Sequence, residues 1–479
     1  MIVAPHLTWA PAWLSDHNAQ RLLQIAVLSI IALAVLLSPR LRNDWLRACV
    51  TLPPSARWLL LAALIAGIIS SAVAPSPRHA FLDVALHVLI FGLVIAVAQA
   101  RRALGGRADV LILSLLTLSV ALYLVRFVSG YLAVLMVGEP LPVRELFSGF
   151  SNVRSFNHYL TWLLPLLAAA AGLRTLPRGA VLTLLGGCWM LLLATDSRGG
   201  LLAVGAGAVF VFACFGRAAA PWLVLQFKAA LAGAVAYGVM FYWLLPASGG
   251  IAERLAHVTE DPARLALWQV AVRMIVDNPA LGVGPMHFAY YPNGIAAGPH
   301  NSVLQWTSEW GAPATLALLI VLFWGMYAWC RQVRSAADVG QTDGVTAVRI
   351  GLTASMATAA AHSLVSGITG SPVSQLLAVL VVGWAIGIYS FASHEAPRHS
   401  HSLGTHLLFA TAALLTLLLL WRGAVPDLEA WRREQLSGQD VPRSSATRLR
   451  YEPRFWLQGL IGDAPYDETQ AVATPPDRH

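Results

Sequence analysis

The sequence is short of charged residues, and lysine is almost absent. Charged side chains make up 12% of the 479 residues, and Lys228 is the only lysine. A soluble protein of this length would carry roughly a quarter charged residues, so the composition excludes an ordinary soluble enzyme. The net charge of +8 is that of loops facing an anionic membrane surface and does not indicate nucleic-acid binding.

Cysteine is also scarce. Cys49, Cys188, Cys214 and Cys330 are scattered, without a CxxC pair or a metal-ligand spacing. Neither a disulfide framework nor a zinc site is therefore expected. The N-terminus also lacks a basic segment ahead of its first apolar run, which argues against a cleaved signal peptide.

Apolar runs of membrane length are abundant. Hydrophobic residues make up 57% of the chain, and a membrane helix needs about 20 consecutive apolar residues. We expect an all-α, polytopic integral membrane protein with about 12 transmembrane helices. The expected spans are residues 21–38, 57–74, 80–99, 109–136, 157–173, 179–195, 199–216, 222–246, 309–330, 347–368, 372–392 and 404–421.

Arginine placement predicts the orientation of these spans. Loops after odd-numbered spans hold about twice as many arginines as the other loops, and arginine-rich loops stay cytoplasmic. Both termini and the long loop 247–308 are therefore expected outside. Residues 1–421 form the expected transmembrane domain, which includes this loop, and residues 422–479 form a polar C-terminal tail.

A polar helical stripe leads into the ninth span. Asn301, Gln305 and Glu309 are four residues apart and share one face of a helix, with His300 at its head. Groups this polar are costly near hydrocarbon and usually line a cavity or a site. Histidine can take a hydroxyl proton near neutral pH, although a structural role is the alternative. The stripe indicates a candidate active centre with His300 as its acid/base group.

Three arginines stand where helices are expected to begin on the outer side: Arg154, Arg198 and Arg264. A cation is unfavourable at a helix N-terminus, because the helix dipole is already positive there. It becomes favourable when an anion binds, since free amides and guanidinium then converge on it. The recurrence indicates a phosphate-rich ligand at the outer face. A headgroup anchor or a surface salt bridge remains the alternative for each arginine.

Arg264 belongs to a loop helix expected from Asp261 to Asp277, with Asp261 as its cap and Pro262 at its first position. One side of this helix is apolar and suits lying on a membrane surface. That side consists of Leu265, Trp268, Val272 and Ile275.

Four histidines crowd the last short loop, with Glu395 as the only carboxylate beside them. Without more carboxylates, no metal is expected at this cluster. The histidines are His394, His399, His401 and His406.

These segments resemble the O-antigen ligase and polymerase superfamily, which also contains the O-linked oligosaccharyltransferases that glycosylate pilins. The resemblance covers roughly residues 150–330. The motifs that carry it are Thr-x-Ser-Arg-Gly at Thr195 to Gly199, Arg264 with Trp268, Pro279 with Gly282-Val283-Gly284, and His300-Asn301-x-x-Leu304-Gln305-x-x-x-Glu309-x-Gly311.

The resemblance implies a metal-independent glycosyltransferase that needs no cofactor. Its donor would be a polyprenyl-diphosphate-linked glycan in the bacterial inner membrane, and its active site would face the periplasm. The family's diphosphate-binding arginines correspond to Arg198 and Arg264, and its essential histidine corresponds to His300. The helix-end argument adds Arg154 to the arginines. The expected supporting residues are Asn301, Gln305 and Glu309.

The acceptor separates the remaining hypotheses. The leading hypothesis is O-antigen ligation to lipid A-core. A polymerase would use a second lipid-linked glycan as acceptor, and a protein O-oligosaccharyltransferase would use a serine or threonine. A transporter or flippase is the alternative from another class, but it predicts internal repeats, which the sequence lacks.

Overall fold

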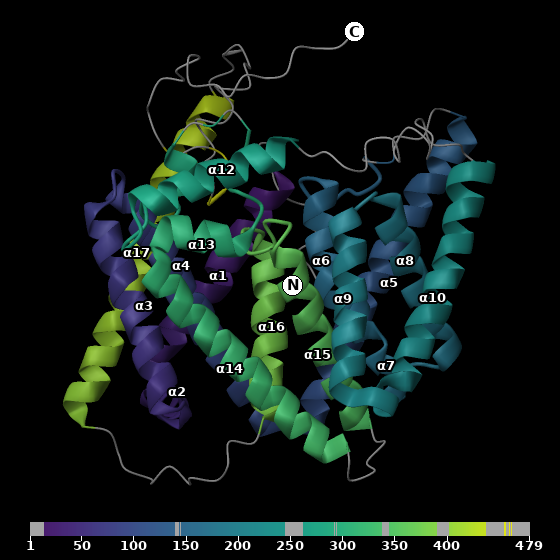
Figure 1. Cartoon of the computed structure of the whole chain (residues 1–479), viewed down its shortest axis with the longest axis horizontal. Coiled ribbons are helices and arrows are strands. Elements are labelled where there is room, and N and C mark those ends of the chain that lie inside the picture. The colour runs from purple at the N-terminus through teal and green to yellow at the C-terminus, as the bar shows by residue number, and fades with distance from the viewer. Residues whose placement is uncertain are drawn as a thin grey trace. The chain divides into compact units, whose positions relative to one another are not determined.

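All regular elements in the described part of the chain are helices, as the computed structural model in Figure 1 shows. The described residues divide into two compact units. The structure describes residues 14–138, 143, 145–244, 262–291, 293, 295–337, 344–389, 402–436, 455, 456, 459 and 461.

Unit 1 consists of Met1–Ala10, Val94–Glu260 and Gly325–Ser390. Its elements are the later part of α4 (Pro77–Leu104), α5 (Gly106–Val137), α6 (Val153–Leu167), α7 (Ala169–Gly172), α8 (Arg178–Ala194), α9 (Arg198–Phe215), η2 (Gly216–Ala219), α10 (Ala220–Gly238), η3 (Val239–Leu244), the later part of α14 (Ala312–Ala337), α15 (Gly344–Ser363) and α16 (Pro372–Ile388).

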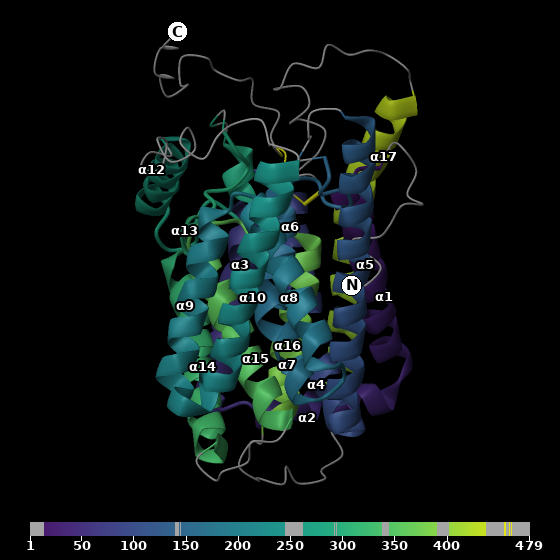
Figure 2. The ribbon, with the colours of Figure 1, turned by 90° about the vertical axis from the view of Figure 1, so that its right-hand side faces the viewer.

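The helices of unit 1 are joined by small residues and by side-chain hydrogen bonds. α8 and α10 run side by side (Figures 1 and 2), and a Cβ at Gly233 would come within 2.6 Å of the Gly186 carbonyl oxygen. α15 contacts both α6 and α9. The Ser355 hydroxyl of α15 donates to the Trp162 carbonyl oxygen of α6 at 2.7 Å. Close backbone approach and interhelical hydrogen bonds are what hold membrane helices together.

A buried carboxylate of unit 1 is paired. Asp109 is 1% exposed, and it accepts from the Arg101 guanidinium at 2.8 Å and from the Trp384 indole N–H at 2.6 Å. Burial of a charge in this way requires a partner. The pair therefore ties α4 and α5 to α16.

Unit 2 consists of Pro11–Leu93, Asp261–Trp324 and Phe391–His479. Its elements are α1 (Asp16–Leu37), α2 (Pro39–Thr51), α3 (Pro54–Val73), the first part of α4, α12 (Pro262–Asp277), η4 (His287–Tyr290), α13 (Ser302–Trp310), the first part of α14, and α17 (Leu403–Leu436).

Within unit 2, α12 and α13 lie across the ends of long helices (Figure 1). α17 continues past residue 422, where the predicted tail begins. Its later part is fastened to the start of α4, because Arg78 donates to Asp427 at 2.6 Å and to the Gly423 carbonyl oxygen at 2.7 Å.

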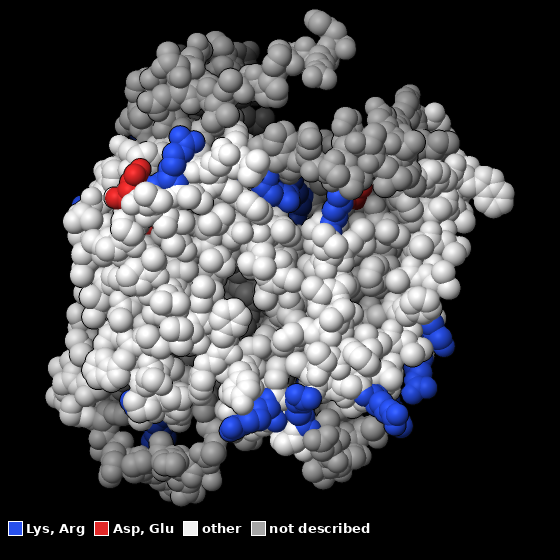
Figure 3. All heavy atoms as spheres, viewed as in Figure 1, with Lys and Arg blue, Asp and Glu red and all other residues white. Residues whose placement is uncertain are grey.

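Seven helical runs are long and apolar enough to cross a membrane, which makes the chain a multi-pass membrane protein. One run has 47 residues, far more than the roughly 20 that one crossing needs, and it contains both α9 and α10. In Figure 3, most of the surface that is not drawn in grey is white and so carries no Lys, Arg, Asp or Glu. The runs are Asp16–Leu37, Pro54–Val73, Pro77–Leu104, Gly106–Val137, Arg198–Leu244, Ala312–Ser335 and Leu403–Arg433.

The all-α architecture predicted from the sequence is confirmed for the described residues, and each of the twelve expected spans overlaps at least one helix. The number of twelve crossings and the external position of the loop 247–308 stay predictions. Residues 247–261 of that loop lie outside the described residues. The polar helix α2 was not predicted, because a search for apolar runs passes over it.

Two thiols of unit 1 lie close enough to be joined by oxidation. All four cysteines are free, and the Cys214 thiol of α9 contacts the Cys330 sulfur of α14 at 3.6 Å. A copper–phenanthroline oxidant is expected to convert this pair into an intramolecular disulfide. Mass spectrometry of the denatured, maleimide-labelled protein should then count two fewer labels. Cys214→Ser is the control and should lose none to the oxidant. Unchanged labelling of the wild-type chain would contradict the packing of α9 beside α14.

Candidate functional site

α12 packs on the segment that leads to His300. Its residues Leu267, Ala271 and Met274 form one buried cluster with Val283 and Phe288. Since burial of apolar surface is the main stabilising contribution to such a contact, the cluster holds the segment between α12 and α13 in a defined conformation.

Backbone hydrogen bonds join the turn after α12 to the end of α13. The Val283 N–H donates to the Ser308 carbonyl oxygen at 2.8 Å, and the Gly284 N–H donates to the Glu309 carbonyl oxygen at 3.1 Å. A helix end leaves its last carbonyl groups without intrahelical partners, and these two bonds provide them. The turn and α13 therefore form one rigid piece.

Side chains of α3 and α4 contact the turn after α12 and the end of α13. The Ser70 hydroxyl of α3 donates to the Leu281 carbonyl oxygen at 2.7 Å. The ring of His87 of α4 packs edge-on against Trp310, with centroids 5.6 Å apart. The fold thus positions the end of α13 through two helices far from it in the sequence.

The predicted stripe of Asn301, Gln305 and Glu309 is hydrogen-bonded within the unit. Asn301 is the N-cap of α13, and its Oδ1 accepts from the N–H groups of Val303 and Leu304, both at 3.0 Å. Glu309 is 1% exposed, and its Oε1 accepts from the Phe288 backbone N–H of η4 at 3.0 Å. The Gln305 amide nitrogen lies 3.5 Å from the Glu309 Oε2. These contacts join α13 to η4. A direct role of the three residues at a ligand stays a prediction.

The stripe is also separated from the membrane span that was expected to begin at residue 309. α13 ends at Trp310, Gly311 has a φ of +84°, and α14 begins at Ala312. A glycine with positive φ is a common stop signal for a helix. Glu309 therefore lies in a short helix of its own.

His287, a buried histidine that sequence reasoning missed, lies in η4. Its Nε2 accepts from the Ser76 N–H at 3.0 Å, so the proton is on Nδ1, which donates to the Pro285 carbonyl oxygen at 2.8 Å. Both ring nitrogens are thus used inside the protein.

Partial burial raises the pKa of the Tyr291 phenol, and Tyr290 adds to this rise, so Tyr291 stays protonated at neutral pH.

His300 has a strained backbone that is held on both sides. Its φ of +53° lies in the left-handed region, which costs about 1–3 kcal/mol for a residue other than glycine. Before it, the Trp268 indole N–H donates to the Pro299 carbonyl oxygen at 3.0 Å; after it, Asn301 caps α13. Strain of this kind persists only where the surroundings impose it, and it gathers at functional sites.

Arg264 lies in the first turn of α12, as predicted, and α12 begins at Pro262. The expected cap Asp261 lies outside the described residues. Arg264 is half-buried and stands one turn before Trp268, so the two side chains share a face of the helix. That face is directed towards the His300 segment.

The apolar side expected for α12 is only partly as predicted. Leu265 and Val272 are 58% and 48% exposed, and Val276 extends this stripe at 71% exposed. Trp268 is half-buried, and its indole N–H donates to the Pro299 carbonyl oxygen. Contact of the exposed stripe with a membrane surface stays a prediction.

In unit 1, Arg198 and Arg154 stand in the first turns of α9 and α6, as predicted, and both side chains are exposed. Ser197 caps α9. The Thr195 hydroxyl donates to Asn157 Oδ1 at 2.9 Å, which joins α6, one turn beyond Arg154, to the turn before Arg198. The two arginines therefore lie at the same end of this unit.

Two buried histidines that sequence reasoning also missed support this turn. The Thr161 hydroxyl donates to the Asn157 carbonyl oxygen at 2.8 Å, so it accepts from His362 Nδ1 at 2.6 Å. The other side of the His362 ring lies beside Gly199, where a Cβ would be 3.7 Å from Nε2. His158 packs edge-on against His362, with centroids 5.5 Å apart. Their buried position among apolar neighbours gave no sequence signal.

The predicted site residues thus form two groups. Arg154 and Arg198 are gathered in unit 1, and Arg264 and His300 in unit 2. The meeting of both groups around one ligand stays a prediction.

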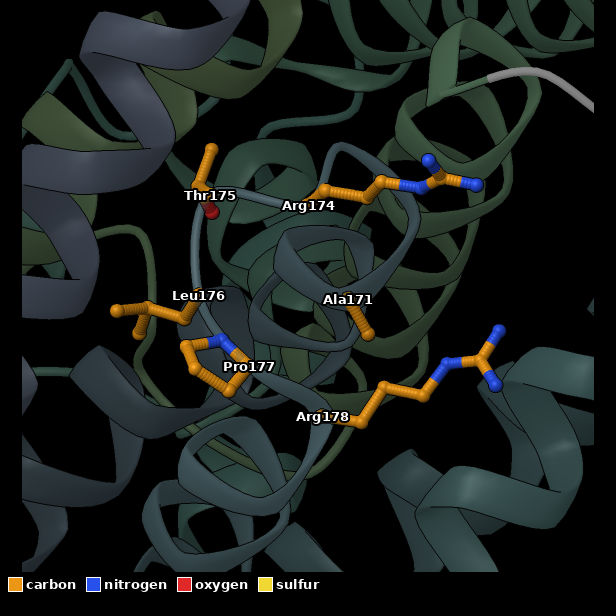
Figure 4. A pocket seen from close by; sticks show the side chains of 6 residues that line it. All are labelled: Ala171, Arg174, Thr175, Leu176, Pro177 and Arg178. Carbon is orange, nitrogen blue, oxygen red and sulfur yellow. The ribbon is translucent and has the colours of Figure 1, made fainter.

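A surface pocket of about 530 Å³ lies between α7 and α8 in unit 1, and none of the predicted site residues lines it. Figure 4 shows that the Arg174 and Arg178 side chains point towards the same side of it. They stand at the opposite end of α8 from Arg198, a helix length of roughly 25 Å. This pocket is therefore not part of the candidate site.

The part of the chain that the structure describes contains no group of three metal-binding side chains. His394, His399 and His401 lie outside the described residues.

The described residues of the C-terminal segment contact other elements of unit 2. Phe455 is 2% exposed; its carbonyl oxygen accepts from the buried Arg21 Nε at 2.8 Å, and the Arg21 guanidinium lies 4.8 Å from its ring centroid. Further on, the Ile461 N–H donates to the Ala289 carbonyl oxygen of η4 at 3.1 Å. The segment predicted as a polar tail thus reaches the element that Glu309 also contacts.

Comparison with known proteins agrees with the sequence motifs. Residues 179–319 match the family model described as O-antigen ligase, which confirms the resemblance drawn from the sequence. The matched range includes Arg198, Arg264, His300 and the whole of α13, whereas Arg154 lies outside it. No curated protein matches the chain.

Proposed function

Taking the O-antigen ligase match over residues 179–319 as the premise, we propose that the chain transfers a glycan from a polyprenyl-diphosphate carrier to an acceptor hydroxyl. The reaction takes place at the periplasmic face of the bacterial inner membrane and needs no metal. O-antigen ligation to lipid A-core is the leading form of this activity.

In the proposed reaction, His300 takes the proton of the acceptor hydroxyl. The acceptor oxygen attacks the anomeric carbon of the glycan, and the bond from that carbon to the diphosphate oxygen breaks. Polyprenyl diphosphate leaves with the electron pair. Arg198 and Arg264, with Arg154 beside Arg198, neutralise the charge that develops on the diphosphate.

The observation that carries the proposal is the conformation of the His300 segment. This histidine is held in the left-handed region between two hydrogen-bonded neighbours, and α12 carries Arg264 one turn from one of these anchors. Asp196 in the turn before Arg198 also has a positive φ, +53°. Strained residues in both segments that carry the family motifs favour a catalytic role over simple membrane anchoring.

Expression in a lipopolysaccharide-producing strain that lacks its own ligase tests the proposal. The wild-type chain should restore O-antigen-capped lipopolysaccharide on gels. Longer lipid-linked chains without capped lipid A-core would indicate the polymerase, and a glycosylated pilin would indicate the protein oligosaccharyltransferase. If none of the three products forms, the proposed glycan transfer is contradicted.

Arginine variants in the same strain test the diphosphate assignment. Arg198→Ala and Arg264→Ala should each lower transfer about 100-fold, because each removes a preorganised partner of the leaving group. Arg174→Ala is the matched control, since it removes an exposed arginine at the other end of α8, and its ladder should equal the wild type. Wild-type ladders from both site variants would remove the arginines from the mechanism.

A further inference from the structure

The hydrogen bond from Trp268 to Pro299 joins two parts of unit 2 that are 31 residues apart in the chain. The indole N–H donates to the carbonyl oxygen at 3.0 Å. This carbonyl belongs to the peptide group between Pro299 and His300. The bond therefore fixes the orientation of the peptide plane that precedes the left-handed residue His300. Proline at this position restricts the backbone further, because its φ is locked.

The donor itself is rigidly held. α12 is anchored through the buried cluster of Leu267, Ala271 and Met274, of which Leu267 and Ala271 neighbour Trp268 on the helix. The indole ring is half-buried, and a bulky aromatic side chain has few rotamers once its ring is packed. A displacement of α12 would therefore also displace the backbone at His300.

We propose that Trp268 is the positioning residue for His300 in glycan transfer, an inference that rests on the proposed function. Trp268 fixes the peptide before His300, while the Asn301 cap fixes the chain after it. The imidazole is thereby aimed at the acceptor hydroxyl. Because Arg264 lies one turn before Trp268, the same helix sets the distance between the base and a diphosphate-binding arginine.

Trp268→Phe removes the N–H donor and keeps an aromatic ring. In the full-length protein, reconstituted with undecaprenyl-diphosphate-linked O-antigen and lipid A-core, we expect kcat to fall about 10- to 100-fold, because misplacement of a reacting group by about 1 Å has effects of this size. The KM for the donor should stay within about twofold of the wild type, since ground-state donor binding does not depend on where the base points.

Trp421→Phe is the matched control. The Trp421 indole N–H also donates a hydrogen bond within unit 2, to the Ser29 hydroxyl at 3.0 Å, away from the His300 segment. Its kcat should equal that of the wild type. Wild-type kcat in Trp268→Phe, or an equal loss in Trp421→Phe, would overturn the positioning role.

Two further variants separate the possible failures. A wild-type chain without turnover would overturn the proposed function itself, and wild-type turnover in His300→Asn would remove His300 as its base. An inactive His300→Asn beside a fully active Trp268→Phe overturns only this inference. If Trp268→Phe is unfolded at the assay temperature, Asn301→Ala is measured instead. This variant removes the cap that fixes the chain after His300, so it should show the same loss of kcat at unchanged KM. A wild-type kcat in Asn301→Ala would overturn the inference.

Discussion

Replacement of His300 by asparagine is expected to lower the rate of glycan transfer by about 10²- to 10⁴-fold, which is the usual contribution of a positioned general base. Asparagine is the informative substitution here, because it tolerates the left-handed φ of +53° better than alanine does. The backbone is thus preserved while the proton acceptor is removed. The formation of polyprenyl diphosphate in reconstituted vesicles, measured in a single turnover, gives the rate directly.

The control for this substitution is His406→Asn. His406 is a half-buried histidine of α17, outside the candidate site, and its loss should leave the single-turnover rate unchanged. Thermal unfolding in detergent should give the same midpoint for His300→Asn and the wild type. A His300→Asn protein that is folded and turns over at the wild-type rate would show that the histidine is structural.

Replacement of Gly311 by alanine is expected to have the largest effect on stability. Its backbone, with φ of 84° and ψ of 160°, lies in a region open essentially to glycine alone. A Cβ there would come within 2.3 Å of the Ala280 carbonyl oxygen, so the turn after α12 must move away from α13. We expect a loss of about 4 kcal/mol or more in the free energy of unfolding, a size reserved for such backbone conflicts.

Gly325→Ala is the matched control on the next helix. No atom lies within 4 Å of a Cβ built at Gly325, and alanine in a helix interior stabilises by about 1 kcal/mol relative to glycine. Urea or thermal unfolding should therefore separate the two variants clearly. A Gly311→Ala protein with wild-type stability would mean that the end of α13 does not pack on the turn as described.

The helices were the most predictable part of this chain. Runs of apolar residues around 21–38 or 109–136 are long enough to be helical in lipid whatever they contact, so α1 and α5 follow from composition. The helix start at Pro262 was predicted because an N-terminal proline acts locally, and the start at Arg198 followed from the apolar run of residues 199–216. The break at Gly311 was missed, because it depends on Ala280, which is distant in the sequence.

The candidate site was predictable only as a set of residue types. Spacing placed Asn301, Gln305 and Glu309 on one face, but their partners in η4 and in the first turn of α13 come from the fold. His287 and His362 gave no periodic or motif signal, since each is a single polar residue satisfied by backbone or hydroxyl groups. The hydrogen bond of Trp268 joins segments that no local rule connects.

The C-terminal segment has a practical consequence for experiments with this chain. The Phe455 carbonyl oxygen accepts a hydrogen bond from the buried Arg21 of α1, and the Ile461 N–H is bonded to η4. Deletion of the last 30 residues would therefore remove a hydrogen-bond acceptor from Arg21 and weaken the hold on η4, which also contacts Glu309. Versions of the chain that end before Phe455 are therefore unsuited to measurements of the proposed activity.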